Sequence, residues 1–127
     1  MQADTTAPKF DPNNDPAKLA RIGTLVTKRL DANPLVQQVD HAEAQLYLYQ
    51  GFLSAADCKT LIAKIDADAV PSTLYKGTEQ EGFRTSYSCH LNRWDAFIAK
   101  VEARMSDVLG IDNTYAETMQ GQRYQDG

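Results

Sequence analysis

The chain has 127 residues, of which 43% are apolar and 24% charged, and its formal net charge is -4. This length suits one domain with a core, and the acidic balance disfavours nucleic acid as a partner. The first residues lack a secretory pattern, and no apolar run approaches the roughly 18 residues of a membrane span. We therefore expect a cytoplasmic protein with neither nucleic acid nor a membrane as partner. Its two cysteines lack metal-type spacing and suggest reduced, at least half-buried thiols.

The amino-terminal region divides into an arm and a helix. Residues 1–14 are rich in Pro, Asn, Asp and Thr without apolar periodicity, which predicts a flexible arm. Asp15 followed by Pro16 is a typical helix start, and apolar residues at helical spacing predict a helix from about Pro16 to Leu30. A polar linker follows, so residues 15–45 form a unit before the main domain.

The main domain, residues 46–127, begins with a strand and a helix. The run from Leu46 to Tyr49 suits a strand that ends before Gly51. Ser54 and the acidic residue three positions later predict a helix start, and Pro71 must follow that helix.

The remaining sequence predicts two strands, a helix and a last strand. Short aromatic and β-branched runs between Ser72 and Leu91 predict a pair of strands. Asn92 is expected to cap a third helix that Gly110 ends. The predicted inward face of this helix consists of Trp94, Phe97, Ile98, Val101, Met105 and Leu109. With a strand in residues 117–124, the order predicts an α+β domain whose helices pack on one side of a sheet.

Three stretches resemble the prolyl 4-hydroxylase-like family of iron(II) and 2-oxoglutarate dependent dioxygenases. They are "YQGFLSAADCKTLIAKI" from Tyr49, "GFRTSYSCHL" from Gly82 and "AETMQGQRYQDG" from Ala116. In this family an Arg-Thr-Ser strand precedes a helix, and a later strand leads through Tyr-x-x-Gly-Gln-x-Tyr/Phe-x-x-His-x-Asp to the first two iron ligands. The residues that fit this lead-in are Glu117, Gln120, Arg123, Tyr124 and Gly127.

The resemblance implies the amino-terminal portion of such an enzyme, ending just before the iron motif. The fold it implies is a helical support layer packed on the first strands of an incomplete double-stranded β-helix, or jelly-roll. The complete enzyme would use Fe(II), 2-oxoglutarate and ascorbate to hydroxylate a peptidyl or small-molecule substrate. Because the distal His and the basic partner of 2-oxoglutarate also come later in the family, we expect this chain alone to be inactive and to bind none of these cofactors.

The resemblance also assigns roles to four residues. Tyr124 would lie with its hydroxyl near the 2-oxoglutarate pocket, whereas Arg84, Ser86 and Glu117 would line the substrate groove. The alternative for Arg84 is a surface ion pair with a nearby glutamate, and the alternative for Tyr124 is a half-buried strand-end tyrosine. We also expect the last strand to have an unpaired edge prone to association. An alternative function is a non-catalytic module that holds a peptide along the strand around Arg84 and Ser86.

One set of residues imitates the ligand order of the family. His41, Glu43, His90 and Lys100 spell His-x-Glu, then a His, then a Lys ten residues later. We reject a metal site there, because Lys100 falls on the outer face of its helix and His41 precedes the first strand of the main domain. Cys89 and His90 are adjacent on a predicted strand and face opposite sides, so the imidazole would not activate the thiol.

Overall fold

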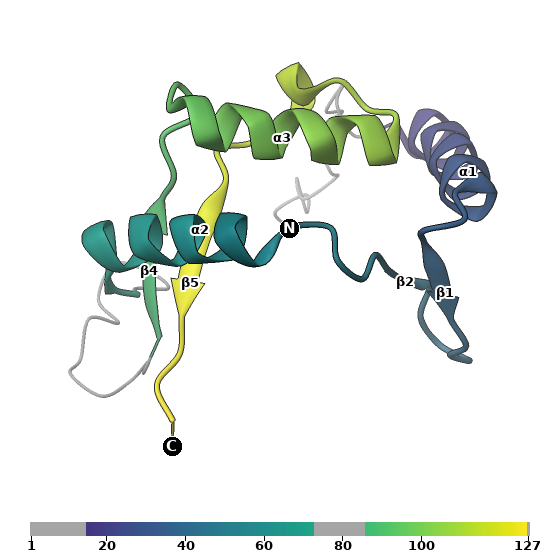
Figure 1. The fold of residues 1–127 in the computed structure, drawn as a ribbon. Helices are drawn as coiled ribbons and strands as arrows, with labels where there is room; N and C mark the ends of the chain where they lie inside the picture. The colour runs from purple at the N-terminus through teal and green to yellow at the C-terminus, as the bar shows by residue number, and fades with distance from the viewer. Residues whose placement is uncertain (1–14, 73–85, 127) are drawn as a thin grey trace, which may run out of the picture.

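The structure, a computed structural model, describes residues 15–72 and 86–126. In these residues the fold is mixed α+β, with three α-helices, a short 3-10 helix and two small antiparallel sheets (Figure 1). The α+β prediction is therefore confirmed. The described strands do not close into a barrel, so the jelly-roll remains a prediction. The predicted arm of residues 1–14 lies outside the described residues.

Helix α1 spans Pro16–Ala32, as predicted, and continues two residues beyond the expected end. The Asp15 Oδ1 atom accepts hydrogen bonds from the backbone N–H groups of Ala17 at 3.0 Å and Lys18 at 3.2 Å, which caps the helix start. The apolar stripe of α1 is largely uncovered. Leu30 is buried, but Leu25 is 67% exposed.

Strands β1 (Gln37–Val39) and β2 (Leu46–Leu48) form an antiparallel hairpin in which Gln38 pairs with Tyr47. The polar linker expected before β2 therefore contains a strand that the sequence did not reveal. The Tyr47 hydroxyl donates to the Asp31 carboxylate at 3.0 Å and ties the hairpin to the end of α1.

Helix α2 spans Ala55–Asp68, and the Ser54 hydroxyl accepts from the Asp57 N–H at 3.1 Å, as expected for an N-cap. Strand β3 (Val70–Pro71) follows it directly. The predicted strand that begins at Ser72 lies almost entirely outside the described residues.

Strands β4 (Tyr87–His90) and β5 (Gln120–Arg123) confirm two of the predicted strands. Together with β3 they form a three-stranded antiparallel sheet in the order β3-β4-β5. The small core lies between this sheet, α2 and the third helix. Its buried and half-buried members are Cys89, Leu91, Ile98, Leu61, Ile65, Phe97 and Met119.

Helix α3 spans Ala96–Leu109 and is capped by Asp95, whose Oδ1 atom accepts from two backbone N–H groups of the first turn. The expected cap at Asn92 is wrong, because the Asn92 side chain instead accepts from the Trp94 N–H at 3.0 Å within the preceding turn. Trp94 consequently lies before the helix and is 88% exposed, which corrects its assignment to the core. Gly110 ends the helix with a left-handed φ of 72°, as predicted.

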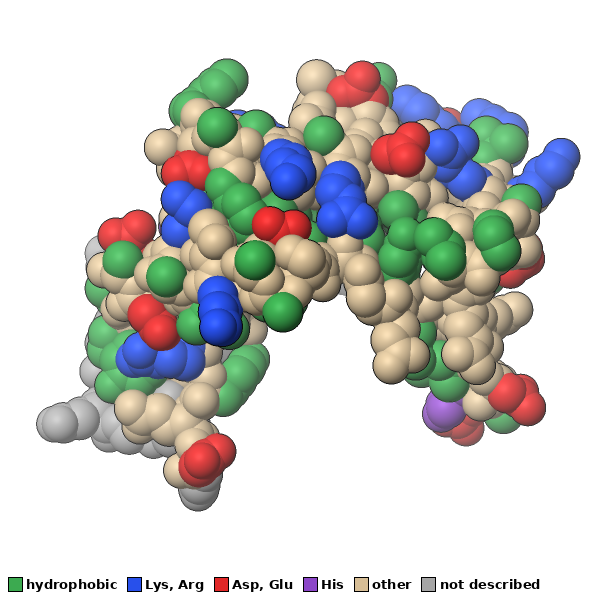
Figure 2. Space-filling model, viewed as in Figure 1, with side chains coloured by type: hydrophobic (Ala, Val, Ile, Leu, Met, Phe, Trp, Pro, Cys, Tyr) green, Lys and Arg blue, Asp and Glu red, His purple; other side chains and the backbone are tan. Residues whose placement is uncertain are grey.

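The described elements form an arch (Figures 1 and 2). Helix α3 lies across the top, one arm holds α2 with the three-stranded sheet, and the other holds the β1–β2 hairpin beside α1. A 3-10 helix, η1 (Asn113–Tyr115), leads from α3 down to β5. Arg93 donates to the backbone oxygens of Asn113 at 3.4 Å and Ala116 at 3.3 Å, which holds η1 beside the start of α3.

Candidate functional site

The face of the three-stranded sheet that points away from α2 is the candidate site, called here the open sheet face. In the β4–β5 register Ser88 pairs with Gln122 and His90 pairs with Gln120, so these four side chains share one face. They line an open hollow of about 510 Å³ together with residues of β3 and the end of α2, including Asp68. The hollow is therefore bordered by hydroxyl, amide, imidazole and carboxylate groups on one part of its wall and by Val70, Pro71 and Cys89 on the rest.

The opposite face of the same sheet packs tightly on α2. A Cβ atom built on Gly121 would lie 2.5 Å from Ile65 Cγ1 and 3.1 Å from Cys89 Sγ, so a larger residue would force these neighbours to shift. Beside it, the Arg123 guanidinium lies 4.8 Å from the centre of the Tyr87 ring and donates to the Asp66 carboxylate of α2 at 3.1 Å. This clamp fixes which face of β5 is left open.

Tyr124, the predicted cofactor residue, extends the open sheet face beyond the end of β5. Its hydroxyl donates to Gln122 Oε1 at 2.7 Å, which places the two side chains on the same side of the chain. The residue is 67% exposed. The phenol can therefore exchange its amide partner for an acceptor on a ligand.

Of the predicted substrate residues that the structure describes, Ser86 lies opposite Tyr124, one position beyond the Tyr87–Arg123 pair of the β4–β5 register, whereas Glu117 does not lie near it. Arg84 lies outside the described residues, as do the glutamates proposed to pair with it. Ser86 immediately precedes β4 but is only 3% exposed, and its hydroxyl has no hydrogen-bond partner among the described residues. Glu117 is exposed and precedes β5, whereas Tyr124 follows it, so the strand separates them by about 13 Å or more.

Among the described residues of the open sheet face, no serine is paired with His90 as a nucleophile with its general base. The Ser88 hydroxyl is 2.7 Å from the Ser72 hydroxyl, with which it shares a hydrogen bond. His90 is two residues further along the strand, at a spacing of about 7 Å that is too long for a direct hydrogen bond. This arrangement can bind a polar ligand, but it does not activate a hydroxyl for attack.

The residues that mimic the metal-ligand order of the family lie far apart in the structure. His41 lies in the turn between β1 and β2, where its Nδ1 atom accepts from the Glu43 N–H at 3.1 Å. His90 lies on β4 in the other arm, and Lys100 is exposed on α3. No three His, Cys, Asp or Glu side chains of the described residues are grouped so that they would hold a metal ion.

The two cysteines differ in solvent exposure. Cys89 is buried against α2, whereas its neighbour His90 is exposed on the other face, as the alternation of the strand predicts. Cys58 is exposed on α2, so the expectation that both thiols are at least half buried is wrong for this one.

The two aspartates with lowered pKa values belong to helix starts and not to the open sheet face. The hydrogen bond from Lys64 to Asp95, 2.7 Å long, is the main cause that lowers the pKa of Asp95, and the backbone N–H of Ile98 adds to it. The pKa of Asp112 is lowered chiefly by the backbone N–H of Thr114 at the start of η1. Both carboxylates therefore stabilise the fold around the sheet.

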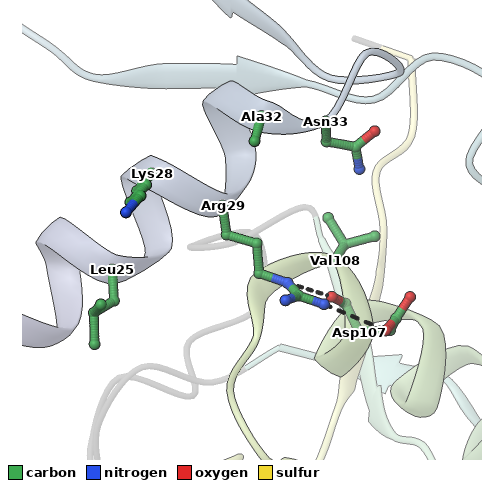
Figure 3. Close-up of a pocket in the computed structure, with 7 residues that line it drawn as sticks. All are labelled: Leu25, Lys28, Arg29, Ala32, Asn33, Asp107 and Val108. Atoms are coloured by element: carbon green, nitrogen blue, oxygen red, sulfur yellow. Dashed lines mark hydrogen bonds and ion pairs between the residues drawn. The ribbon is translucent and has the colours of Figure 1, made fainter.

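A second hollow, of about 480 Å³, lies between α1 and the end of α3 (Figure 3). Arg29 crosses it and donates from Nε to the backbone oxygen of Asp107 at 2.8 Å and from Nη2 to its carboxylate at 3.4 Å. The guanidinium thus satisfies a free carbonyl in the last turn of α3, which is a structural role.

Of the polar side chains that line the main hollow, the sequence pattern points to Gln120 and to His90 for other reasons, and to neither Ser88 nor Gln122. Ser88, Gln120 and Gln122 are common polar residues, and only the pairing of β4 with β5 brings them together. The signal available in the sequence was their period of two, which places Gln120, Gln122 and Tyr124 on one face of a strand.

Comparisons of the chain with protein-family models, with curated proteins and with solved structures gave no match. Among the described residues, no helix combines the length and apolar character needed to cross a bilayer.

Proposed function

We propose that this chain is the amino-terminal part of a prolyl 4-hydroxylase-like dioxygenase that depends on iron(II) and 2-oxoglutarate. One observation carries the proposal: the sheet is covered by α2 on one face and has a polar, open second face that continues to Tyr124. A barrel that encloses a keto acid needs such a sheet, with an apolar outer face and a polar inner one. The order of the three motifs in the sequence supports the same assignment.

The described residues do not fit the iron site itself. A facial triad needs two histidines and one carboxylate on adjoining positions, and the described His, Asp and Glu side chains form no such group. The ligands would have to come from a segment outside the described residues. Under this proposal the chain supplies the support layer and one wall of the pocket, and has no activity by itself.

Within that wall, Tyr124 is the residue proposed to meet 2-oxoglutarate. In the structure its hydroxyl donates a hydrogen bond to Gln122 Oε1. In the complete enzyme it would instead donate to the far carboxylate of the keto acid. Arg84 and Glu117 remain proposed contacts for the substrate. Ser86 is proposed as a third, but its buried hydroxyl must first be uncovered.

The peptide-binding alternative has less support. It depends entirely on the strand around Arg84 and Ser86, and the buried Ser86 side chain would have to be uncovered before it could meet a peptide. A self-sufficient module of that kind would unfold cooperatively as a monomer, which thermal melting combined with light scattering would reveal.

The test begins with the coding DNA beyond the Gly127 codon. We expect the next ten or so codons to encode Gln-x-Phe/Tyr-x-x-His-x-Asp. The complete product, supplied with Fe(II) and ascorbate, should release succinate from 2-oxoglutarate. A stop codon directly after Gly127, or a continuation without this motif, would refute the proposal.

Within the complete product, Tyr124→Phe should raise the KM for 2-oxoglutarate about tenfold, because one hydrogen bond to a charged group is lost. Tyr115→Phe is the matched control, since Tyr115 is 83% exposed on η1 and away from the open sheet face. Equal KM values for both variants would contradict the assignment of Tyr124 to the 2-oxoglutarate pocket.

A further inference from the structure

The outer edge of β5 presents backbone groups without a partner strand among the described residues. The Leu91 N–H donates to the Met119 oxygen at 2.8 Å, which identifies this pair as a hydrogen-bonded pair of the ladder. Because such pairs alternate, Gly121 and Arg123 direct their N–H and C=O groups toward β4. The backbone groups of Gln120 and Gln122 therefore point outward.

The opposite edge of the sheet is closed to strand addition. The Ser72 N–H donates to the Ser86 oxygen at 2.9 Å, so the neighbouring position, Pro71, faces away from β4. Proline has no N–H to offer a new strand, and β3 is only two residues long. Within residues 15–72 and 86–126, the β5 edge is thus the one that can accept a strand.

The β5 edge also has room beside it. In Figure 1, β5 is the strand of its sheet nearest the gap between the two arms, and Figure 2 shows open space in that gap. No described element of the chain pairs with this edge.

We propose that β5 pairs antiparallel with β5 of a second copy of this chain, around a two-fold axis at Gln122. The proposal concerns the 127-residue chain and does not rest on the proposed function. It joins two three-stranded sheets into one continuous sheet, with the two Gln122 residues exchanging their backbone hydrogen bonds.

Charge selects this register among the neighbouring ones. Pairing Gln122 with Tyr124 of the second copy would place the two Arg123 residues directly opposite each other, which is unfavourable. Pairing Gln120 with Gln122 of the second copy would leave Tyr124 without a partner in the strand. In the proposed register Arg123 lies opposite Gly121 of the second copy, and Gln120 lies opposite Tyr124.

The chemistry of the edge favours a second copy over an unrelated strand. Arg123 is the one charged residue within β5, and its charge is already neutralised by Asp66 of the same copy. Of the outward positions, Gln120 and Gln122 carry amides and Tyr124 a hydroxyl, and both groups donate as well as accept, so they complement themselves. A second β5 strand therefore supplies matching hydrogen-bonding groups, and no additional charged residue is needed to pair with Arg123.

The test is sedimentation analysis of the purified chain and of charge variants at the two-fold axis. The wild-type chain should dimerise. Gln122→Lys and Gln122→Glu should each raise the dimer dissociation constant about 2- to 5-fold, because like charges then face each other across the axis. An equimolar mixture of the two variants should recover the wild-type value or better. Leu25→Lys, on the exposed stripe of α1, is the matched control and should leave the constant unchanged.

A second pair of variants tests the backbone directly. Gln122→Pro removes an outward N–H and should raise the dissociation constant about 10- to 100-fold, whereas Gln122→Ala should change it little. Circular dichroism of each variant checks that the fold is kept. A monomeric wild-type chain, or a dimer whose charge variants do not recover on mixing, would overturn the proposal.

Discussion

The contact between Gly121 and α2 gives the sharpest prediction about stability. In Gly121→Ala the new Cβ atom would lie 2.5 Å from Ile65 Cγ1 and 2.9 Å from Cδ1, both closer than such atoms approach in folded proteins. The Ile65 side chain cannot rotate away easily, because a β-branched residue in a helix has one strongly preferred χ1 rotamer. Overpacking of this kind costs about 1–3 kcal/mol.

Part of that cost is offset in the unfolded chain. Gly121 does not adopt a positive φ, so alanine suits its backbone and restricts the unfolded state, which contributes up to about 1 kcal/mol of stability. We therefore expect a net loss of about 1–2 kcal/mol in the free energy of unfolding. Urea titration followed by circular dichroism would measure this loss. An unchanged slope of unfolding free energy against urea concentration would confirm that the midpoint reports stability.

Two further variants isolate the cause. Gly23→Ala, in the middle of α1 with no atom within 4 Å of the new Cβ, should instead stabilise the chain by about 0.8–1.0 kcal/mol. In an Ile65→Ala background, Gly121→Ala should cost little, giving a coupling energy of about 1 kcal/mol or more. If Gly121→Ala costs the same with and without the Ile65 side chain, the described packing of β5 on α2 is wrong.

Three other predictions concern two helix ends and the contact of β5 with α2. Gly110→Ala, at a φ of 72°, should lower the free energy of unfolding by about 1–2 kcal/mol, and Gly110→Asn by less, as urea titration would show. Since the pKa of Asp95 is lowered in the folded state by Lys64, its contribution is present above its unfolded value of 3.8 and is lost as the pH falls below it. Thermal melting from pH 7 to about pH 3 should therefore show a smaller loss for Lys64→Met than for the wild type, and equal losses would contradict this role. Arg123→Ala should cost about 1 kcal/mol in urea titration, because it removes both the ring contact and the ion pair, whereas Asp66→Asn should cost less than half of that.

The helices could be predicted because their signals are local. Asp15 and Ser54 cap helices where expected, since a cap needs only the side chain and the next few N–H groups. The exception is instructive: Asn92 and Asp95 are both good caps, and the sequence alone did not show that the Asn92 side chain closes a turn first. The three-residue shift also moved Trp94 from the predicted core into solvent.

The sheets and the candidate site could be predicted only in part because they depend on partners distant in sequence. Strand β1 has a single apolar residue, Val39, and exists through its pairing with β2. The family resemblance alone points to Tyr124. Its companions Ser88 and Gln122 come together only through the register of β4 with β5, which local pattern does not determine.

Pro71 has a consequence for the size of any assembly. A sheet with two usable edges can add copies at both ends and grow into a fibre, which is how exposed strands lead to aggregation. In the part of the chain that the structure describes, one edge carries proline at its outward position, which leaves this sheet a single point of attachment in each copy. Pairing through β5 then uses up that point in both copies, and growth through this sheet stops at two.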